Sequence, residues 1–277
     1  MAADAAIASY TKIDDMEEGG DSIEWMPPPG LVPGIWNSFS DCTQPDTILP
    51  IPGYFDPNGW SYATLPTPVA TFPGILSTHA ARLRTTAPVF LGWGAAMGFD
   101  LGELPNANGG VLALNTPDTG ATPNGSSSCT DPFPVYSGVA VDLSAYAGIT
   151  FWAMADPEGA QSVLVELNDR NTDPRAGICN AVDPSSTANC YNGFAVSLTL
   201  TGTLTQYTIN FSSLRQNPTW GYQPDPSVLD LQHVYELVFL APAPSSVCQT
   251  SATSMCAGGR QSTSFDLWID DLYFVNN

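Results

Sequence analysis

Apolar and polar residues alternate along much of this chain. Val163, Val165 and Leu167 alternate with Leu164 and Glu166. A period of two residues is typical of a strand in an antiparallel sheet with one buried face. The stretch ITFWAMA is apolar throughout, as expected of a central strand that is covered on both faces.

Similar segments, rich in β-branched and aromatic residues, recur along the chain between Gly, Pro, Asn and Asp. We expect strands at Tyr10–Met16, Ser22–Met26, Gly34–Asp41, His79–Thr85, Val89–Leu101, Gly138–Leu143, Ile149–Ala155, Ser162–Asn168, Gly193–Leu200, Gln206–Phe211, His233–Leu240 and Ser264–Val275. Phe211–Gln216 is a short helical candidate, and the Pro- and Gly-rich stretches Thr43–Thr78 and Pro105–Pro134 are expected to be long loops. The pattern predicts an all-β protein, a single jelly-roll β-sandwich of two antiparallel sheets over residues 1–277, with 1–9 as an extended or flexible N-terminal segment.

The charge of the chain restricts its partners. Seven Lys and Arg stand against 27 Asp and Glu, which gives a net charge of −20. Such a chain repels nucleic acid and anionic membrane surfaces. No apolar run reaches the roughly 20 residues that span a bilayer, so we expect no membrane insertion.

The composition is typical of an exported protein. Lys12 is the single lysine, while Ser, Thr, Asn, Gly and Pro are abundant. The N-terminal residues lack the basic and long apolar regions of a signal peptide. We therefore expect a secreted, extracellular protein whose signal peptide has been removed.

The cysteines fit an oxidising compartment. They are Cys42, Cys129, Cys179, Cys190, Cys248 and Cys256. Cys179 with Cys190 and Cys248 with Cys256 each bracket one polar loop, so these spacings predict two local disulfides. The two remaining cysteines are left as a third pair. The alternatives are free thiols or a metal site, and the absence of a C-x2-C spacing disfavours zinc.

Carboxylates crowd both ends of the chain. Near the N-terminus lie Asp14, Asp15, Glu17, Glu18, Asp21 and Glu24, and near the C-terminus lie Asp266, Asp270 and Asp271. If the first and last strands are neighbours, like charges meet with little cationic relief. Clusters of oxygen ligands of this kind are what calcium takes, and the alternative is a solvated acidic surface.

Two features suit sugar recognition. Trp60, Trp220 and Tyr222 lie in Gly-, Pro- or Asn-rich segments where an exposed ring can stack on a sugar, although burial under a loop is the commoner fate of a single Trp. The strand VLVELNDRNTDPRAGIC brings Asp169 and Arg170 to its end, where they can bind hydroxyl groups or form a salt bridge that orders the loop. Trp152 and Trp268, in strongly apolar strands, are expected in the core.

Standard catalytic signatures are absent. The sequence holds no G-x-S-x-G, H-E-x-x-H or Walker A motif, and it has two histidines. A carboxylate pair for glycoside hydrolysis stays open, because with 27 acids some pair is inevitable.

Seven segments, in order, carry a resemblance to a known family. They are TKIDDMEEGG, GIWNSFSD, FLGWGAAMGFDL, VDLSAYAGITFWAMA, VLVELNDRNTDP, LTQYTINFSSLRQNPTWG and FDLWIDDLYF. In these segments the chain resembles the secreted galactose-binding-like β-sandwich domains of bacterial extracellular proteins, near carbohydrate-binding module family 11. The resemblance implies two antiparallel sheets, one of them concave, and a structural calcium that maps onto Asp15, Glu17 and Asp270 or Asp271.

The resemblance also implies polysaccharide binding on the concave face. Together these features predict a non-catalytic protein that binds neutral polysaccharide, with Trp60, Trp220 and Tyr222 for stacking and Asp169 and Arg170 for hydroxyl groups. One alternative is a structural or adhesion protein that self-associates through the same sandwich. Another is a glycan-cleaving enzyme with a carboxylate pair.

Overall fold

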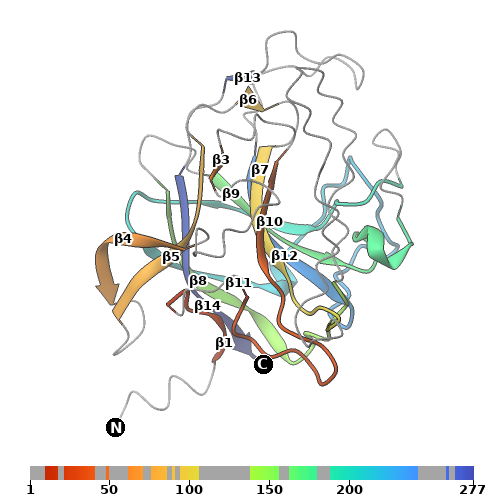
Figure 1. Ribbon diagram of the computed structural model, residues 1–277. Helices are drawn as coiled ribbons and strands as arrows, with labels where there is room; N and C mark the ends of the chain where they lie inside the picture. The colour runs from red at the N-terminus through yellow and green to blue at the C-terminus, as the bar shows by residue number, and fades with distance from the viewer. Residues whose placement is uncertain are drawn as a thin grey trace.

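The chain forms two packed antiparallel sheets (Figure 1). The computed structural model describes residues 10–17, 22–40, 48–49, 62–70, 76–85, 89–90, 94–105, 138–155, 162–179, 188–242, 260–261 and 266–277. Within these ranges no helix is long and apolar enough to cross a membrane. The expected all-β sandwich is confirmed.

The larger sheet has seven strands and contains both ends of the described chain. Its strands are β11 (Thr205–Asn210), β8 (Tyr146–Ala155), β14 (Asp266–Asn276), β5 (Leu76–Thr85) and β3 (Ile48–Leu49) in spatial order, with β1 (Tyr10–Asp14) paired to β14 and β4 (Tyr62–Ala70) paired to β5. The pairing of β1 with β14 makes the first and last strands neighbours, as the acidic ends of the chain require for a shared site.

The second sheet has five strands and carries the candidate site. Its strands, in spatial order, are β10 (Phe194–Thr199), β9 (Ser162–Asp169), β12 (Val234–Pro242), β7 (Gly94–Asp100) and β2 (Trp36–Ser40). A separate small ladder pairs β13 (Arg260–Gln261) with β6 (Val89–Phe90). Two short 3-10 turns are η2 (Pro174–Ala176) and η3 (Phe211–Ser213), of which η3 replaces the helix expected at 211–216.

The core fills the space between the two sheets. Alternate residues of the strands face inward, among them Phe99, Phe151, Leu167, Leu237 and Ile269, all of which are buried. Because side chains alternate between the two faces of a strand, their immediate neighbours project outward. This alternation determines which polar side chains reach the outer face of a sheet, where a ligand can bind.

Several sequence expectations need correction. Segments 22–26 and 138–143 form isolated bridges, such as the one between Val141 and Val234, rather than full strands. β4 lies inside the stretch that was expected to be a loop. Trp268 is buried, but it packs with Ala80 outside the main core, and the Arg82 guanidinium lies 4.2 Å from its ring centroid.

Candidate functional site

A row of polar side chains crosses the outer face of the five-stranded sheet. Glu236 on β12 pairs with Asn168 on β9 on one side and with Asp100 on β7 on the other. Their chain neighbours Leu167, Leu237 and Phe99 belong to the core, so the three polar side chains face away from it. Residues directly opposite on adjacent strands have Cβ atoms about 5 Å apart, which makes the row continuous.

The turn after β9 places a guanidinium over this row. Asp173 caps η2 by accepting a hydrogen bond from the Arg175 backbone N–H at 2.8 Å. The same carboxylate binds the Arg175 side chain through Nε at 2.8 Å and NH2 at 2.6 Å, a two-pronged contact. The remaining arm, NH1, reaches Asp100 Oδ1 at 2.7 Å. The turn is therefore tied to β7 across the sheet.

Glu166 completes the cluster one step along β9. Its carboxylate accepts hydrogen bonds from the Gly193 backbone and from the Asn168 side chain. A Cβ atom at Gly193 would lie 2.3 Å from Glu166 Oε1, so a larger residue at this position would displace the Glu166 side chain. Asn168 Nδ2 also donates to Glu236 Oε2 at 3.4 Å, which puts one amide between two glutamates.

We call this set the Arg175 cluster. It consists of Asp100, Glu166, Asn168, Asp173, Arg175 and Glu236. Four carboxyl groups thus share one guanidinium. Burial raises the pKa of Glu166 to about 7, and burial together with the charge of Asp100 raises the pKa of Glu236 well above its usual range.

Two tyrosines border the Arg175 cluster. The Arg175 guanidinium lies 5.2 Å from the centroid of the Tyr235 ring. Burial raises the pKa of Tyr191, and the nearby charges of Asp173 and Glu236 raise it further, so its hydroxyl stays protonated. Both rings are half-buried. They supply aromatic surface beside a dense set of hydrogen-bonding groups.

The cluster contains two acceptor atoms that are unsatisfied by the described protein. Asp100 Oδ2 and Asn168 Oδ1 are buried and have no hydrogen-bond partner, although the two side chains are only 1% and 2% exposed. Buried acceptors normally find a donor, because an unmet one costs free energy comparable to a lost hydrogen bond. A Cβ atom at Gly138 would lie 2.5 Å from Asp100 Oδ2, so Gly138 covers that oxygen, and Asn168 Oδ1 is the acceptor left for a donor from outside the described chain.

An exposed indole is held next to this region. Trp220 is 40% exposed. Its carbonyl accepts a hydrogen bond from Asn192 Nδ2, and the Tyr222 backbone N–H donates to the Asn189 carbonyl at 2.8 Å. Asn192 immediately precedes Gly193, which contacts Glu166. The Trp220 loop is thus linked through one short segment to the Arg175 cluster.

The ligand residues expected from the sequence are not all brought together. Trp60 lies outside the described residues. Trp220 and Tyr222 share the loop just described. Asp169 is fully buried and anchors the turn, accepting hydrogen bonds from the backbone N–H groups of Asn171 and Asp230 at 2.9 Å each. Half-exposed Arg170 pairs with Asp230 through a 2.7 Å contact.

The residues expected to hold calcium divide into two places. Asp14, Asp15 and Glu24 each offer an oxygen within 4.8 Å of the others. Lys12 already supplies a cation there: its ammonium lies 3.0 Å from Asp15 Oδ2 and also contacts Glu24. Asp15 is thus neutralised by a lysine.

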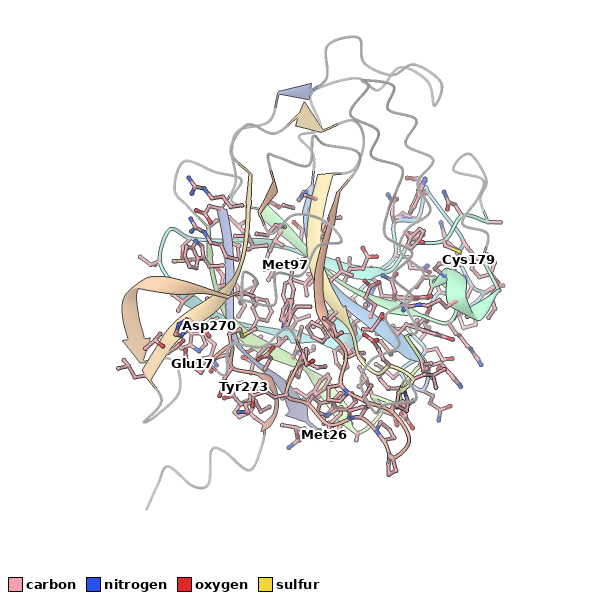
Figure 2. All side chains as sticks on the ribbon, viewed as in Figure 1. Glu17, Met26, Met97, Cys179, Asp270 and Tyr273 are labelled. Carbon is pink, nitrogen blue, oxygen red and sulfur yellow. A yellow bond between two sulfur atoms is a disulfide. The ribbon has the colours of Figure 1, made fainter. Side chains whose placement is uncertain are left out.

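Glu17 and Asp270 meet elsewhere, through Ser77. The Ser77 hydroxyl lies 3.1 Å from Glu17 Oε1 and 2.6 Å from Asp270 Oδ2. Figure 2 shows Glu17 and Asp270 on the same side of the molecule, away from Cys179. Asp270 and Asp271 are fully buried, and Asp270 Oδ1 has no hydrogen-bond partner in the described chain. Burial, with the charges of Asp271 and Glu17, raises the pKa of Asp270 to about 8.

One expected disulfide is present. Cys179 and Cys190 are bonded and close the loop that leads from η2 to Tyr191. The bond therefore joins the segment that follows Arg175 to the segment that precedes Gly193. Cys42, Cys129, Cys248 and Cys256 lie outside the described residues.

No family model matches the chain, and no curated protein matches it. Among solved structures, it is similar to the family 11 carbohydrate-binding module of the cellulosomal cellulase Lic26A-Cel5E of Clostridium thermocellum, with 11% identity and a TM-score of 0.44 over 97% of this chain and 95% of that chain. A family 11 module of the same organism, in complex with a β-1,3-1,4-mixed-linked tetrasaccharide, has 12% identity and a TM-score of 0.40 over 87% and 88%.

A family 30 carbohydrate-binding module of the cellulosomal cellulase Cel9D-Cel44B of Clostridium thermocellum is also similar, with 12% identity and a TM-score of 0.38 over 88% of this chain and 98% of that chain. Similarity at this level describes the strand arrangement only loosely. The two-sheet architecture rests on the strand pairing of the chain itself.

Proposed function

We propose that this protein binds carbohydrate without cleaving it, on the outer face of its five-stranded sheet. The observation that carries the proposal is the Arg175 cluster, a fixed set of donors and acceptors with tyrosine rings beside it. Sugars present both hydroxyl groups and apolar C–H faces. Sites that bind them therefore combine a few oriented polar groups with aromatic surface.

The polar groups of this site are held in place before any ligand arrives. Arg175 is fixed by Asp173 and Asp100, and the Cys179–Cys190 disulfide ties the segment that follows its turn to the segment that precedes Tyr191. Groups that are already ordered lose little conformational entropy on binding. Trp220, on its anchored loop, offers a further ring for stacking.

The charge of the site indicates which glycans it accepts. Four carboxyl groups around one guanidinium, in a chain of net charge −20, repel sulfated and uronate polymers. We therefore propose a glycan without negative charge as the ligand.

Calorimetry against neutral, cationic and anionic oligosaccharides tests this proposal. We expect a dissociation constant between about 1 μM and 1 mM for at least one uncharged or cationic glycan, or roughly −8 to −4 kcal/mol. Tyr235→Ala removes one ring and should weaken binding about fivefold, since an aromatic contact contributes ~1 kcal/mol. Tyr10→Ala, on the other sheet, is the matched control. Absence of heat from every glycan would refute carbohydrate binding.

A second candidate, glycan cleavage, is favoured by one observation. Glu166 and Glu236 lie on neighbouring strands, and both have a raised pKa, which is common among catalytic acids. Release of reducing ends from a bound glycan, lost in Glu166→Gln, would establish the enzyme. Binding without release supports the non-catalytic function.

We also propose a structural calcium ion near the chain ends. The buried pair of Asp270 and Asp271, next to Glu17, offers carboxylate oxygens of the kind that calcium prefers, and Asp270 Oδ1 lacks a donor. The ion would neutralise these charges and join β14 to the segment that follows β1. The disulfide and the single lysine support the further proposal that the protein is exported.

A further inference from the structure

The Arg175 cluster is chemically one-sided, because it offers far more acceptors than donors. Arg175 directs its side-chain hydrogen bonds to Asp173 and Asp100. Glu166 and Glu236 receive N–H groups from Asn168, but neither has a cation hydrogen-bonded to it in the described contacts. Two carboxyl groups are thus left without a positive partner of their own.

Two unpaired acceptor atoms in the cluster point to the same missing group. Asn168 Oδ1 and Asp100 Oδ2 are buried acceptors without a donor, as described above. Asn168 is only 2% exposed, and its amide is hydrogen-bonded to the two glutamates, so this oxygen lies within the cluster. The missing component is therefore a group that carries several N–H or O–H donors and, beside Glu166 and Glu236, a positive charge.

We propose that the Arg175 cluster binds the ammonium group of an amino sugar, so that the preferred ligand is a glycan with free amino groups. This inference rests on the proposed carbohydrate-binding function and names its ligand class. An ammonium has three donors and one positive charge. It can hydrogen-bond to a glutamate and to the Asn168 carbonyl oxygen together, while the sugar ring lies against Tyr191 or Tyr235.

An ammonium suits the cluster better than a metal ion does. The Asn168 amide N–H group occupies the space between the two glutamates, where a metal would need an oxygen ligand. Among the described residues, no three acids of the Arg175 cluster bring ligand atoms close enough together to hold a metal by themselves.

A matched set of three tetrasaccharides tests the inference. β-1,4-linked glucosamine, N-acetylglucosamine and glucose tetramers share one backbone and differ only in the group at carbon 2. Calorimetry at pH 7 and low salt, where about half of the Glu166 carboxyl groups are ionised before ligand arrives, should give at least tenfold tighter binding for the glucosamine tetramer than for the other two. The expectation follows from a charge-assisted hydrogen bond in a partly buried site.

Three variants decide whether the cluster is responsible. Glu166→Gln and Glu236→Gln keep the shape of the side chain and remove its charge, so each should reduce the preference for the glucosamine tetramer about tenfold. Asp142→Asn removes one exposed carboxylate, whose described interactions are with Ser144 and His233 rather than with the cluster, and controls for net charge. Two glutamate variants are used so that misfolding of one leaves the test intact, and circular dichroism checks the fold of each.

The outcomes separate this inference from the proposed function. Equal or tighter binding of the neutral tetramers overturns the amino-sugar preference and leaves carbohydrate binding standing. A preference that survives both glutamate substitutions overturns it as well, because long-range charge then explains it. If none of the three tetramers binds while another glycan does, the inference fails alone. If no glycan of any class binds, the proposed function fails with it.

Discussion

Glu166 and Asp169 lie three residues apart on β9 and have different surroundings. Side chains of a strand alternate between its faces, so Asp169 follows Val165 and Leu167 toward the interior, while Glu166 faces outward. Both carboxylate oxygens of Asp169 accept hydrogen bonds from backbone N–H groups, of Asn171 in the turn and of Asp230. Glu166 has a half-buried carboxylate in the Arg175 cluster, where burial raises its pKa.

The alternation of inward and outward side chains along β9 is visible in the sequence. The alternation of Val163, Val165 and Leu167 predicts that Asp169 faces inward. The polar loop at the end of β9 was found, but Asp169 and Arg170 were chosen in it rather than Asp173 and Arg175. Asp100 and Glu236 could not have been found, because they join the cluster through strand register, which no local pattern specifies.

The ionisation of Glu166 gives a prediction about stability. Its pKa in the folded protein is about 7, above the ordinary value of 4.5, so the folded state binds this proton more tightly than the unfolded state does. The free energy of unfolding should therefore fall as pH rises from about 4.5 to about 7. Glu166→Gln cannot ionise and should be more stable than the wild type at pH 8, by about 1–2 kcal/mol after allowance for partial exposure.

Urea unfolding from pH 4 to pH 8 measures this difference. Glu24 and Asp270 also have raised pKa values and stay in both proteins, so the informative quantity is variant minus wild type. That difference should grow with pH and level off above about pH 8. Asp142→Asn should show no such growth. A constant offset across the range for Glu166→Gln would contradict the pKa assigned to Glu166.

At the scale of elements, β4 shows how proline misleads a strand prediction. Pro66 and Pro68 made this stretch look like a loop. In the structure β4 pairs with β5, and the register shifts between Thr64 and Val69, where the prolines lie. Proline cannot donate a ladder hydrogen bond, so it is tolerated at bulges and sheet edges. The clearly alternating strands β9 and β11 were predicted nearly residue for residue.

The contact between β14 and the residues after β1 carries the calcium prediction. If an ion binds near Asp270 and Asp271, chelator should lower the melting temperature and added calcium should restore it. A ligand present at a hundred times its dissociation constant stabilises the folded state by about 2.7 kcal/mol. Asp270→Asn should abolish the response to calcium, and without metal it should be at least as stable as the wild type, because the amide cannot acquire a charge at this buried position.

Asp142→Asn removes the same charge at an exposed position and should keep the full calcium response. Scanning calorimetry with and without chelator makes the comparison, and elemental analysis counts the metal. Melting temperatures that do not change with chelator, in a protein found to contain no calcium, would remove the ion from the proposal.

For the whole molecule, the sandwich separates two acidic regions. One lies where the chain ends meet on the seven-stranded sheet, and the other lies on the outer face of the five-stranded sheet. The overall class and the sheet type followed from alternation along the chain, whereas the meeting of the chain ends was implied by the family resemblance. The pairing of β9 with β12 and β7 did not, because strand order depends on contacts between residues distant in sequence. The site is built from that order.

The most direct test of the central claim is to locate the ligand on the molecule. Backbone amide shifts should be recorded by NMR while the protein is titrated with the glycan that binds most tightly in calorimetry. We expect the largest changes around Asn168, Glu236 and Asp100 and in the turn that holds Arg175. Changes confined to the outer face of the seven-stranded sheet, around Trp152 and Trp268, would contradict the assignment of the site.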